Sequence, residues 1–331
     1  MVTIKDVARL AGVSPSTASR AMHDNDMISQ ATKDRVKKVM EELDYSPNYS
    51  AQNLVKRRNN KVGIILPIRE SHETIGDNPF FMQIIQGISG ICTDKQQMVA
   101  LATGRTEQEL LANITTMIRS GNISKFIFLY SKAEDPVYNF VTREKVDCVV
   151  VGRSFTEEES ENSQYIDNDN RQAGYDASKY ILDKGFSKVT YIYNDMDEMV
   201  QAERYIGFAN AMKEIGQKAN SFNISLADCL KLQSYLLENP TQAFVSCDDI
   251  MAIKLQKLLR DIGQGADQKA IISFNNSIIA QIANPSLTSV EIFPYKLGEA
   301  AAEAILAENH SKNELVIIPH QIIERSSTQE S

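Results

Sequence analysis

Three polar side chains near the start of the chain have the types and the spacing needed to read the edges of bases. Ser16, Thr17 and Arg20 lie in one predicted helix, on the side away from its apolar residues. A guanidinium can donate two hydrogen bonds to a guanine edge, and hydroxyl groups can bond bases or phosphates. These groups therefore suit a helix that lies in the major groove of DNA.

A second group of side chains follows the carboxyl ends of predicted strands in the rest of the chain. Aromatic rings can stack on the apolar face of a pyranose, while Arg, Asp and Asn side chains can bond adjacent hydroxyl groups. Ligands of parallel sheets bind beyond these strand ends, so the group is a candidate sugar site. Each Asp can instead be a helix N-cap, and the two Phe residues can instead belong to the core. The candidates are Phe80, Phe81, Tyr130, Arg153, Asp167, Arg204, Asp248 and Asn275.

Two short predicted helices separated by a tight turn must position the first group. Thr3, with an acidic residue three positions later, is a start signal for the first helix, and residues 4–11 carry an apolar face with helical spacing. Gly12 ends this helix. Ser14 is a good N-cap and Pro15 a favoured first residue for the next one. Two short helices around a turn that contains Gly are typical of a helix-turn-helix.

A third helix is predicted to begin at a Ser29 cap, with an apolar stripe over residues 36–43. Lys33, Lys37 and Lys38 lie off this stripe, so they can contact phosphate or only solvent. The pattern indicates a small helical domain with a partly basic surface.

Residues 48–60 are predicted to form a short helix followed by a polar linker. Leu54 is an apolar side chain in a segment with few neighbours to bury it. It can pack against the first domain or the next one, or it can be a wedge between base steps in the minor groove.

From residue 61 onward, strand-like segments alternate with helical ones, which implies parallel sheets covered by helices. The segments fall into two series and predict two doubly wound lobes. The expected strands are 61–67, 97–104, 125–130 and 147–152 in the first series, and 164–167, 188–194, 242–248 and 269–275 in the second.

The charge of the chain is divided unevenly between these parts. The net charge of −8 over 331 residues argues at first against a nucleic-acid partner. The first 60 residues, however, hold ten Lys and Arg against seven Asp and Glu, a balance of +3, so the remainder carries −11. A basic part beside an acidic one is consistent with DNA contact by the basic part alone.

Composition and motifs exclude several other classes of protein. The 43% hydrophobic and 24% charged residues are those of a soluble globular chain, and no apolar stretch is long enough for a membrane helix. No secretory signal is recognisable, so a cytoplasmic location is expected rather than that of a secreted sugar receptor. The four Cys and four His lack metal-ligand spacing, and no phosphate-binding or dinucleotide-binding Gly motif is present. We therefore expect no metal, no cofactor and no catalytic residues.

Three sequence runs resemble the LacI/GalR family of bacterial transcription regulators. They are VTIKDVARLAGVSPSTASR at residues 2–20, the segment ending EELDYSPN at Asn48, and SAQNL at residues 50–54. The combination of NPFF, IFLY and YIDNDNRQAG is most similar to the maltose-operon repressor branch of Gram-positive bacteria. One departure is Ala18, where most members carry Val. Another is Asn275, which stands where the family pattern has an Asp that bonds the ligand.

The resemblance implies roles for particular residues. Leu54 would be the minor-groove wedge, and Arg204 in RYIGF would be an arginine that contacts the effector. The first-strand ligand loop would include Phe80 and Phe81. The implied DNA contacts are Thr3, Ser14, Ser16, Thr17, Arg20, Tyr45, Asn48, Ala51 and Leu54.

The same resemblance implies an α/β architecture with a small all-α helix-turn-helix head and a two-lobed body like that of periplasmic binding proteins. The expected segments are 1–47 for the head, 48–60 for the hinge and linker, 61–162 with 294–320 for the N-terminal lobe, and 163–293 with 321–331 for the C-terminal lobe. The implied function is a homodimeric repressor of sugar-utilisation genes that binds a near-palindromic operator and is switched by a sugar such as maltose or a maltodextrin. A corepressor, a protein partner or a different sugar are the alternatives.

Overall fold

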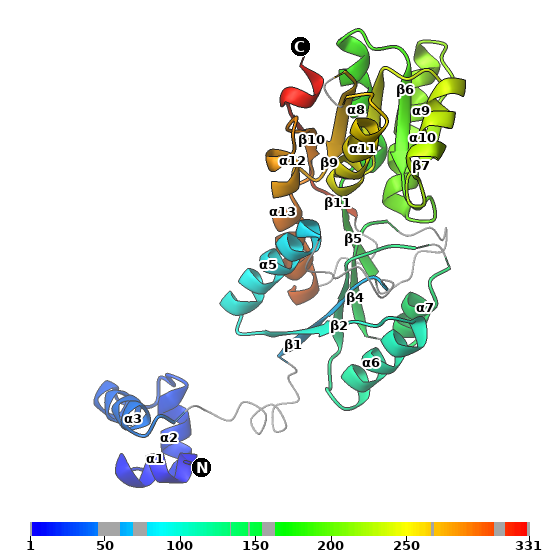
Figure 1. The fold of residues 1–331 in the computed structure, drawn as a ribbon. Helices are drawn as coiled ribbons and strands as arrows, with labels where there is room; N and C mark the ends of the chain where they lie inside the picture. Colours follow the sequence, from blue (N-terminus) through cyan, green and yellow to red (C-terminus); the bar gives the residue numbers. More distant parts are fainter. Residues whose placement is uncertain are drawn as a thin grey trace. The chain divides into compact units, whose positions relative to one another are not determined.

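The structure, a computed structural model, forms two compact units, Met1–Asn59 and Asn60–Ser331 (Figure 1). It describes residues 2–45, 60–68, 78–132, 134–144, 146–153, 163–265, 268–307 and 315–329. Within these ranges, no helix combines the length and apolar character needed to cross a membrane.

The smaller unit contains the three predicted helices, α1 (Ile4–Leu10), α2 (Pro15–Met22) and α3 (Gln30–Glu42). Small side chains at the helix contacts allow the backbones to approach closely, and the helix-turn-helix prediction is confirmed by this arrangement. The buried core consists of Val7, Ala8, Ala11, Ala18, Ala21, Val36 and Val39.

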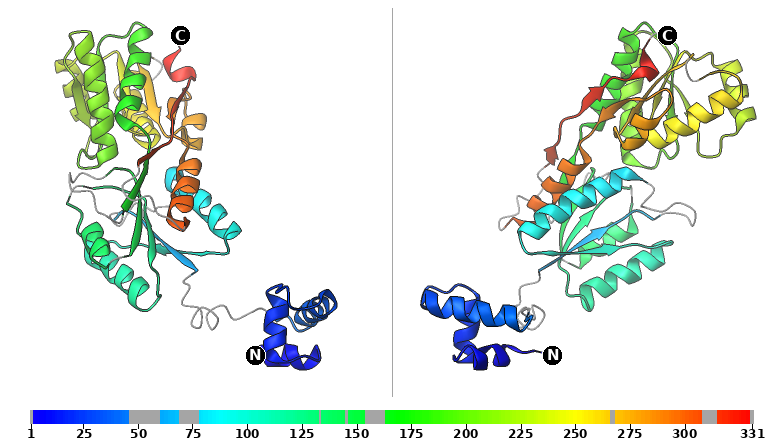
Figure 2. Two further views of the ribbon diagram at one scale, coloured as in Figure 1. Left: turned by 180° about the vertical axis from the view of Figure 1, so that it is seen from behind. Right: turned by 60° about the vertical axis from the view of Figure 1, so that its left-hand side comes forward.

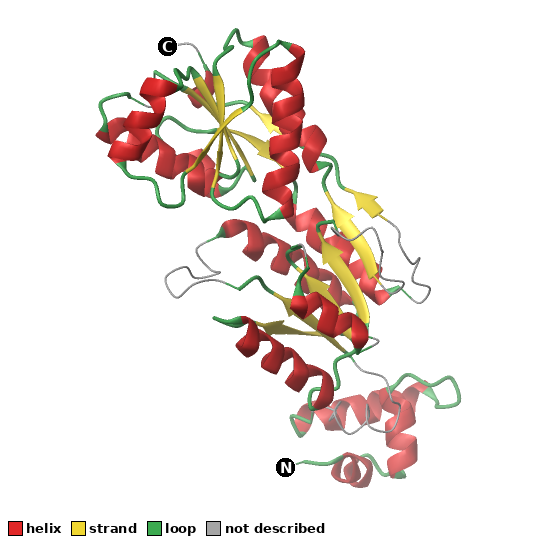
Figure 3. Ribbon diagram, turned by 90° about the vertical axis from the view of Figure 1, so that its right-hand side faces the viewer, coloured by secondary structure: helices red, strands yellow, loops and turns green. Residues whose placement is uncertain are grey.

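The first lobe of the larger unit is a parallel six-stranded sheet between two pairs of helices (Figures 1 and 3). In spatial order its strands are β11 (Leu315–Ile317), β5 (Ser163–Asp167), β4 (Asp147–Val151), β3 (Lys125–Phe128), β1 (Lys61–Ile65) and β2 (Met98–Ala102). Helices α5 (Pro79–Asp94) and α13 (Pro294–Leu306) bury their apolar residues against one face. Helices α6 (Glu107–Arg119) and α7 (Pro136–Arg143) do so against the other.

The second lobe repeats this design with a second six-stranded sheet (Figure 2). In spatial order its strands are β12 (Gln321–Ile323), β10 (Thr288–Glu291), β9 (Ala270–Phe274), β8 (Ala243–Ser246), β6 (Val189–Tyr193) and β7 (Asn220–Asn223), of which β12 alone runs antiparallel to its neighbour. Helices α8 (Asn170–Asp183) and α9 (Met199–Glu214) cover one face. Helices α10 (Cys229–Glu238), α11 (Asp249–Asp261) and α12 (Ile278–Ile282) cover the other.

The chain passes between the two sheets three times, at residues 168–169, 292–293 and 318–320. Strand β5 was expected to begin the second lobe, but it pairs with β4 and β11 in the first sheet. The predicted lobe boundary between residues 162 and 163 is therefore wrong, and the first crossover follows Asp167. Alternation along the chain reveals that a strand exists but not which sheet it joins, because strand pairing is a long-range contact.

Several short elements carry no strong pattern in the sequence. Strand β7 has the polar sequence NSFN, and β11 and β12 are three residues each. Their hydrogen bonds are supplied by sheet neighbours, so a periodic apolar signal is not required for them to form. The eight strands predicted from apolar patterning thus underestimate the two six-stranded sheets.

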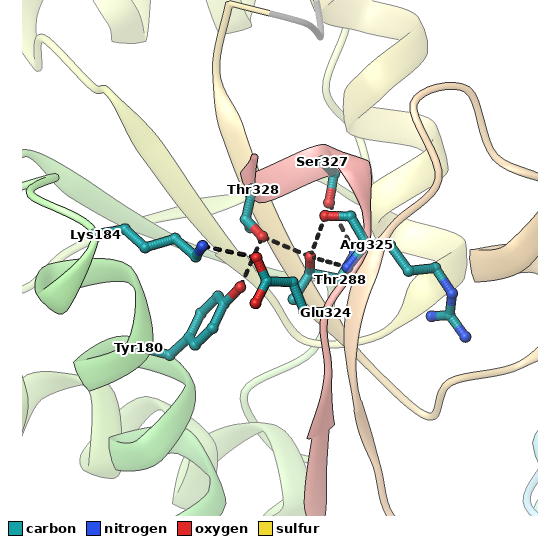
Figure 4. A network of polar contacts seen from close by, with 7 residues as sticks. All are labelled: Tyr180, Lys184, Thr288, Glu324, Arg325, Ser327 and Thr328. Carbon is teal, nitrogen blue, oxygen red and sulfur yellow. Dashed lines mark hydrogen bonds and ion pairs between the residues drawn. The ribbon is translucent and has the colours of Figure 1, made fainter. Parts of the chain in front are cut away.

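The residues after the third crossover are fastened to the second lobe by a polar network (Figure 4). The buried Thr288 hydroxyl accepts a hydrogen bond from the Arg325 N–H at 2.9 Å, and the Thr288 N–H donates to the Ser327 hydroxyl at 2.8 Å. Lys184, the C-cap residue of α8, forms an ion pair with Glu324 at 2.8 Å. Because the buried Thr288 and Ser327 groups are paired, the C-terminal segment forms part of the second lobe.

Candidate functional site

Helix α2 presents the hydroxyl groups that the sequence singled out. The Ser14 hydroxyl caps the helix by accepting a hydrogen bond from the Thr17 N–H at 3.1 Å. The same oxygen lies 2.9 Å from the Ser16 hydroxyl and 2.8 Å from the Thr17 hydroxyl. Arg20 is exposed one turn later, while Ala18 and Ala21 are turned into the core. The exposed side of this helix therefore presents hydroxyl groups and a guanidinium to a binding partner.

The lysines of α3 have an intramolecular role that the sequence left open. Lys33 donates to the Asp24 carbonyl at 2.9 Å, and Lys37 forms an ion pair with the Asp24 carboxylate at 2.8 Å. Asp24 has a left-handed backbone with φ of 50°, and the hydrogen bond from Lys37 lowers the pKa of its carboxyl group. The two lysines thus hold the turn that follows α2. No short-range sequence motif predicts this contact, because Asp24 and Lys37 lie 13 positions apart in the sequence.

The other predicted DNA contacts divide into two groups. Thr3 is exposed at the start of α1 and donates from both its N–H and its hydroxyl to Asp6, at 3.0 Å and 2.8 Å. Tyr45 packs against the helical core. Asn48, Ala51 and Leu54 lie outside the described residues.

Arg204 on α9 is the centre of a buried polar cluster in the second lobe. Its side chain is 3% exposed, and its guanidinium carbon lies 4.1 Å from the centroid of the Phe274 ring. Nε donates to Asn170 at 3.0 Å, and Nη1 donates to the Cys247 carbonyl at 2.7 Å. These bonds use two of the five guanidinium N–H groups, and no described residue accepts from the other three. A buried guanidinium needs acceptors, and burial lowers its pKa, so the cluster suits a ligand with oxygen atoms.

Asp167 lies at the carboxyl end of β5 and joins this cluster through Asn170. Its Oδ1 accepts hydrogen bonds from the Asn168 N–H at 2.8 Å and from the Asn170 side chain at 2.9 Å. Burial raises the pKa of Asp167 to about 7, against the opposing effect of the Arg153 and Arg204 charges. The carboxyl group can therefore either accept or donate a hydrogen bond near neutral pH.

Asp248 and Asn275 follow strands β8 and β9 on the same edge of the second sheet. Asp248 caps α11 by accepting a hydrogen bond from the Met251 N–H at 2.7 Å, so its N-cap role is real. It also follows Cys247, whose carbonyl binds Arg204, and burial raises the pKa of Asp248 to about 6. Asn275 follows Phe274 and has a φ of 96°, a backbone conformation that few side chains other than Asn adopt.

The two phenylalanines have different environments. Phe81 is 6% exposed and belongs to the core of the first lobe. Phe80 is partly buried and packs against the core clusters of both lobes, with its ring 5.2 Å from that of Phe81. Of the two rings, Phe80 therefore contacts both lobes, whereas Phe81 belongs to the core of the first lobe.

Tyr130 and Arg153 line a pocket at the edge of the first sheet, beside α7. The hydroxyl oxygens of Tyr130 and Ser131 are buried and have no hydrogen-bond partner among the described residues. Burial, together with the neighbouring Asp135 carboxylate, raises the pKa of the Tyr130 phenol, so the hydroxyl stays protonated. The pocket is lined by Phe128, Tyr130, Ser131, Lys132, Asp135, Tyr138, Val150, Arg153 and Tyr165.

The structure thus brings Arg204, Asp167 and Asp248 together, and Arg153 lies near enough for its charge to act on Asp167. Sequence reasoning missed Asn170 and Phe274, which hold Arg204 in place. Asn170 follows a strand end, as the candidates do, so it could have been included on that signal. Tyr138 and Tyr165 carry no such signal, because they reach the pocket from the first turn of a helix and from the middle of a strand.

Comparison with known proteins agrees with the two-unit architecture. The family model described as bacterial regulatory proteins, lacI family, matches residues 3–48. A periplasmic binding protein-like domain matches residues 179–328. The two matches fall on the helical unit and on the two-lobed unit, respectively.

The chain is 32% identical to the HTH-type transcriptional regulator MalR of Streptococcus pneumoniae, over 98% of this chain and 99% of that protein. It superimposes on a probable maltose operon transcriptional repressor from Staphylococcus aureus with a TM-score of 0.76, at 24% identity over 83% of this chain and 99% of the other. The lac repressor dimer bound to operator gives a TM-score of 0.81 at 17% identity, over 99% of both chains, and this likeness concerns the fold alone. Fold, motifs and full-length identity together show that the chain belongs to the lacI family of bacterial regulatory proteins and is a DNA-binding transcriptional regulator rather than an enzyme.

Proposed function

We propose that this regulator represses sugar-utilisation genes and that a small sugar of the maltose or maltodextrin type, bound between its two lobes, switches its affinity for the operator. The observation that carries the proposal is the buried Arg204 guanidinium, which has three N–H groups without an acceptor among the described residues. A sugar hydroxyl can accept from these groups and donate to a carboxylate at the same time.

The groups around Arg204 favour a neutral sugar over a charged ligand. Asp167 and Asp248 can accept hydrogen bonds from hydroxyl groups, and their ionised forms oppose an anionic ligand. Phe80, which contacts both lobes, offers a ring for the apolar face of a pyranose. The buried Tyr130 and Ser131 hydroxyls, which have no hydrogen-bond partner among the described residues, lie in a first-lobe pocket that Arg153 also lines. The maltose assignment draws on the relative whose description names a maltose operon.

The helical unit supplies the operator contact in this proposal. Ser16, Thr17 and Arg20 read base edges from α2, and Leu54, which lies outside the described residues, is the minor-groove wedge. Two copies of the chain bind a near-palindromic operator, as the two-fold symmetry of a dimer requires. The lac repressor, whose fold this chain shares, is a dimer in its complex with operator.

The switch follows from differential binding. A sugar that contacts both lobes binds the closed form more tightly than the open one and so shifts the population toward closure. Couplings of this kind are typically about 1–3 kcal/mol, a factor of about 5–150 in operator affinity.

A calorimetric screen of maltose, maltodextrins and common hexoses tests the sugar assignment. We expect a maltose-type sugar to bind wild-type protein and to lose nearly all affinity with Arg204→Ala. The matched control is Arg171→Ala, which removes an exposed arginine of α8 that pairs with Glu203 at 2.8 Å. Binding of a different sugar would correct the specificity, while no sugar binding at all would favour a corepressor or a protein partner.

A further inference from the structure

Asn168, at the first crossover, contacts both of the other crossovers through a single side-chain amide. Its Nδ2 donates to the Ile318 carbonyl at 2.8 Å and to the Ile292 carbonyl at 3.1 Å. Ile292 belongs to the second crossover and Ile318 to the third, although they lie 124 and 150 residues away in sequence. Asn168 is 2% exposed, so neither bond is exchanged readily for one to bulk water.

The backbone of the same residue reaches the Arg204 cluster. The Asn168 N–H donates to the Asp167 carboxylate, which also accepts from Asn170, and Asn170 accepts from Arg204 Nε. The Ile318 N–H in turn donates to the Asp167 carbonyl at 2.8 Å. A continuous set of hydrogen bonds therefore joins the predicted effector arginine to all three segments about which the lobes must turn.

We propose that Asn168 is the positioning residue that makes the three crossovers one hinge and couples the ligand at Arg204 to lobe closure. The proposal rests on the proposed function for its ligand but not for its geometry. Without the amide, the lobes remain covalently connected and Arg204 keeps its own partners, yet each crossover moves independently. A ligand then still binds, but its binding no longer moves the first lobe as a rigid body.

The hinge itself is tested without any ligand, by hydrogen–deuterium exchange of the full-length protein. We expect Asn168→Ala to accelerate exchange of the backbone amides of Ile292, Phe293, Ile318 and His320 by about tenfold or more, while the helices of both lobes exchange as in wild type. The control is Asn239→Ala, which removes an amide that donates to the Tyr235 carbonyl within the second lobe, away from the crossovers. Unchanged exchange at both crossovers would overturn the proposal.

Coupling is tested with maltose as the probe, by calorimetry and by operator binding. In Asn168→Ala we expect the affinity for maltose to stay within about threefold of wild type, while the ratio of operator affinities with and without maltose falls toward one. If Asn168 had a purely structural role, the substitution would instead reduce the affinity for maltose and the ratio of operator affinities in parallel. An unaltered ratio would contradict the proposal. If Asn168→Ala does not fold, Asn168→Asp keeps the side-chain size and removes both donors. If wild type does not bind maltose, the sugar assignment fails, and the exchange experiment alone decides the hinge.

Discussion

Arg204 and Asp167 show how burial changes the pKa of individual residues. Both side chains lie in the interior of the two-lobed unit, where neither can be solvated fully, and both are oriented by Asn170. Burial raises the pKa of Asp167 to about 7, well above that of an Asp in an unfolded chain. Between about pH 4 and pH 7 the folded chain therefore holds a proton that the unfolded chain has released. Stability consequently falls as the pH rises through this window.

We expect Asp167→Asn to remove part of this pH dependence. From pH 5 to pH 8 the free energy of unfolding of wild type should fall, relative to that of the variant, by at least about 1 kcal/mol. The reason is that the variant has no carboxyl group at this position to ionise. Urea unfolding at the two pH values measures the difference. Asp228→Asn, at the exposed N-cap of α10, is the control. An identical pH dependence of stability in Asp167→Asn and wild type would refute the raised pKa of Asp167.

Arg20 is the residue on which operator discrimination should depend most. Because its side chain is exposed, Arg20→Ala should change the free energy of unfolding by less than about 0.5 kcal/mol. It should reduce discrimination between the operator and a variant at the contacted base pair by about 1–3 kcal/mol. Gel-shift titrations with both duplexes provide the measurement, and Lys38→Ala, an exposed cation of α3, is the control. Unchanged selectivity would exclude Arg20 as a base-reading residue.

At the scale of elements, the contact between α8 and α9 places Arg204. Gly174 on α8 and Gly207 on α9 let the two helix backbones approach so closely that a Cβ at either position would meet the opposing backbone. At Gly174 the atoms in the way belong to Arg204 itself, including its Cα at 2.7 Å. The glycine in RYIGF, Gly207, therefore allows the close contact between α8 and α9 that positions Arg204.

Gly174→Ala should therefore impair both stability and sugar binding. We expect a loss of about 1–3 kcal/mol in free energy of unfolding from overpacking. The affinity for sugar should also fall, because the Arg204 backbone must move. Gly90→Ala on α5 is the matched control, since its Cβ would meet only the Tyr295 hydroxyl at 3.4 Å. Sugar affinity equal to wild type in a folded Gly174→Ala protein would show that the contact between α8 and α9 does not determine the position of Arg204.

The elements also show what can be predicted from a sequence of this kind. The cap at Ser14 and the division of the second helix into a polar and an apolar side depend on neighbours within one or two turns, and the structure confirms them. The sheet that β5 joins and the partners of Arg204 depend on residues far away in sequence, so local patterns do not reveal them. Candidate residues at strand ends were found, whereas the contacts that orient them were not.

At the scale of the whole molecule, charge and connectivity separate the two tasks of the regulator. The first 60 residues carry +3 and the remainder −11, so attraction to phosphates is confined to the helical unit and its linker. The two-lobed unit is joined internally by three crossovers that meet at one buried amide. In the proposed function, a sugar bound near Arg204 acts on both lobes through these crossovers, and the resulting change in operator affinity is the quantity to measure.

Fluorescence anisotropy of the full-length protein on a labelled operator duplex, with and without the sugar found by calorimetry, tests this account most directly. For wild type we predict that the sugar weakens operator binding by about 5–150-fold. For Arg204→Ala we predict wild-type operator affinity without sugar and no response when sugar is added. A sugar that binds the wild-type protein but leaves its operator affinity unchanged would contradict the central claim.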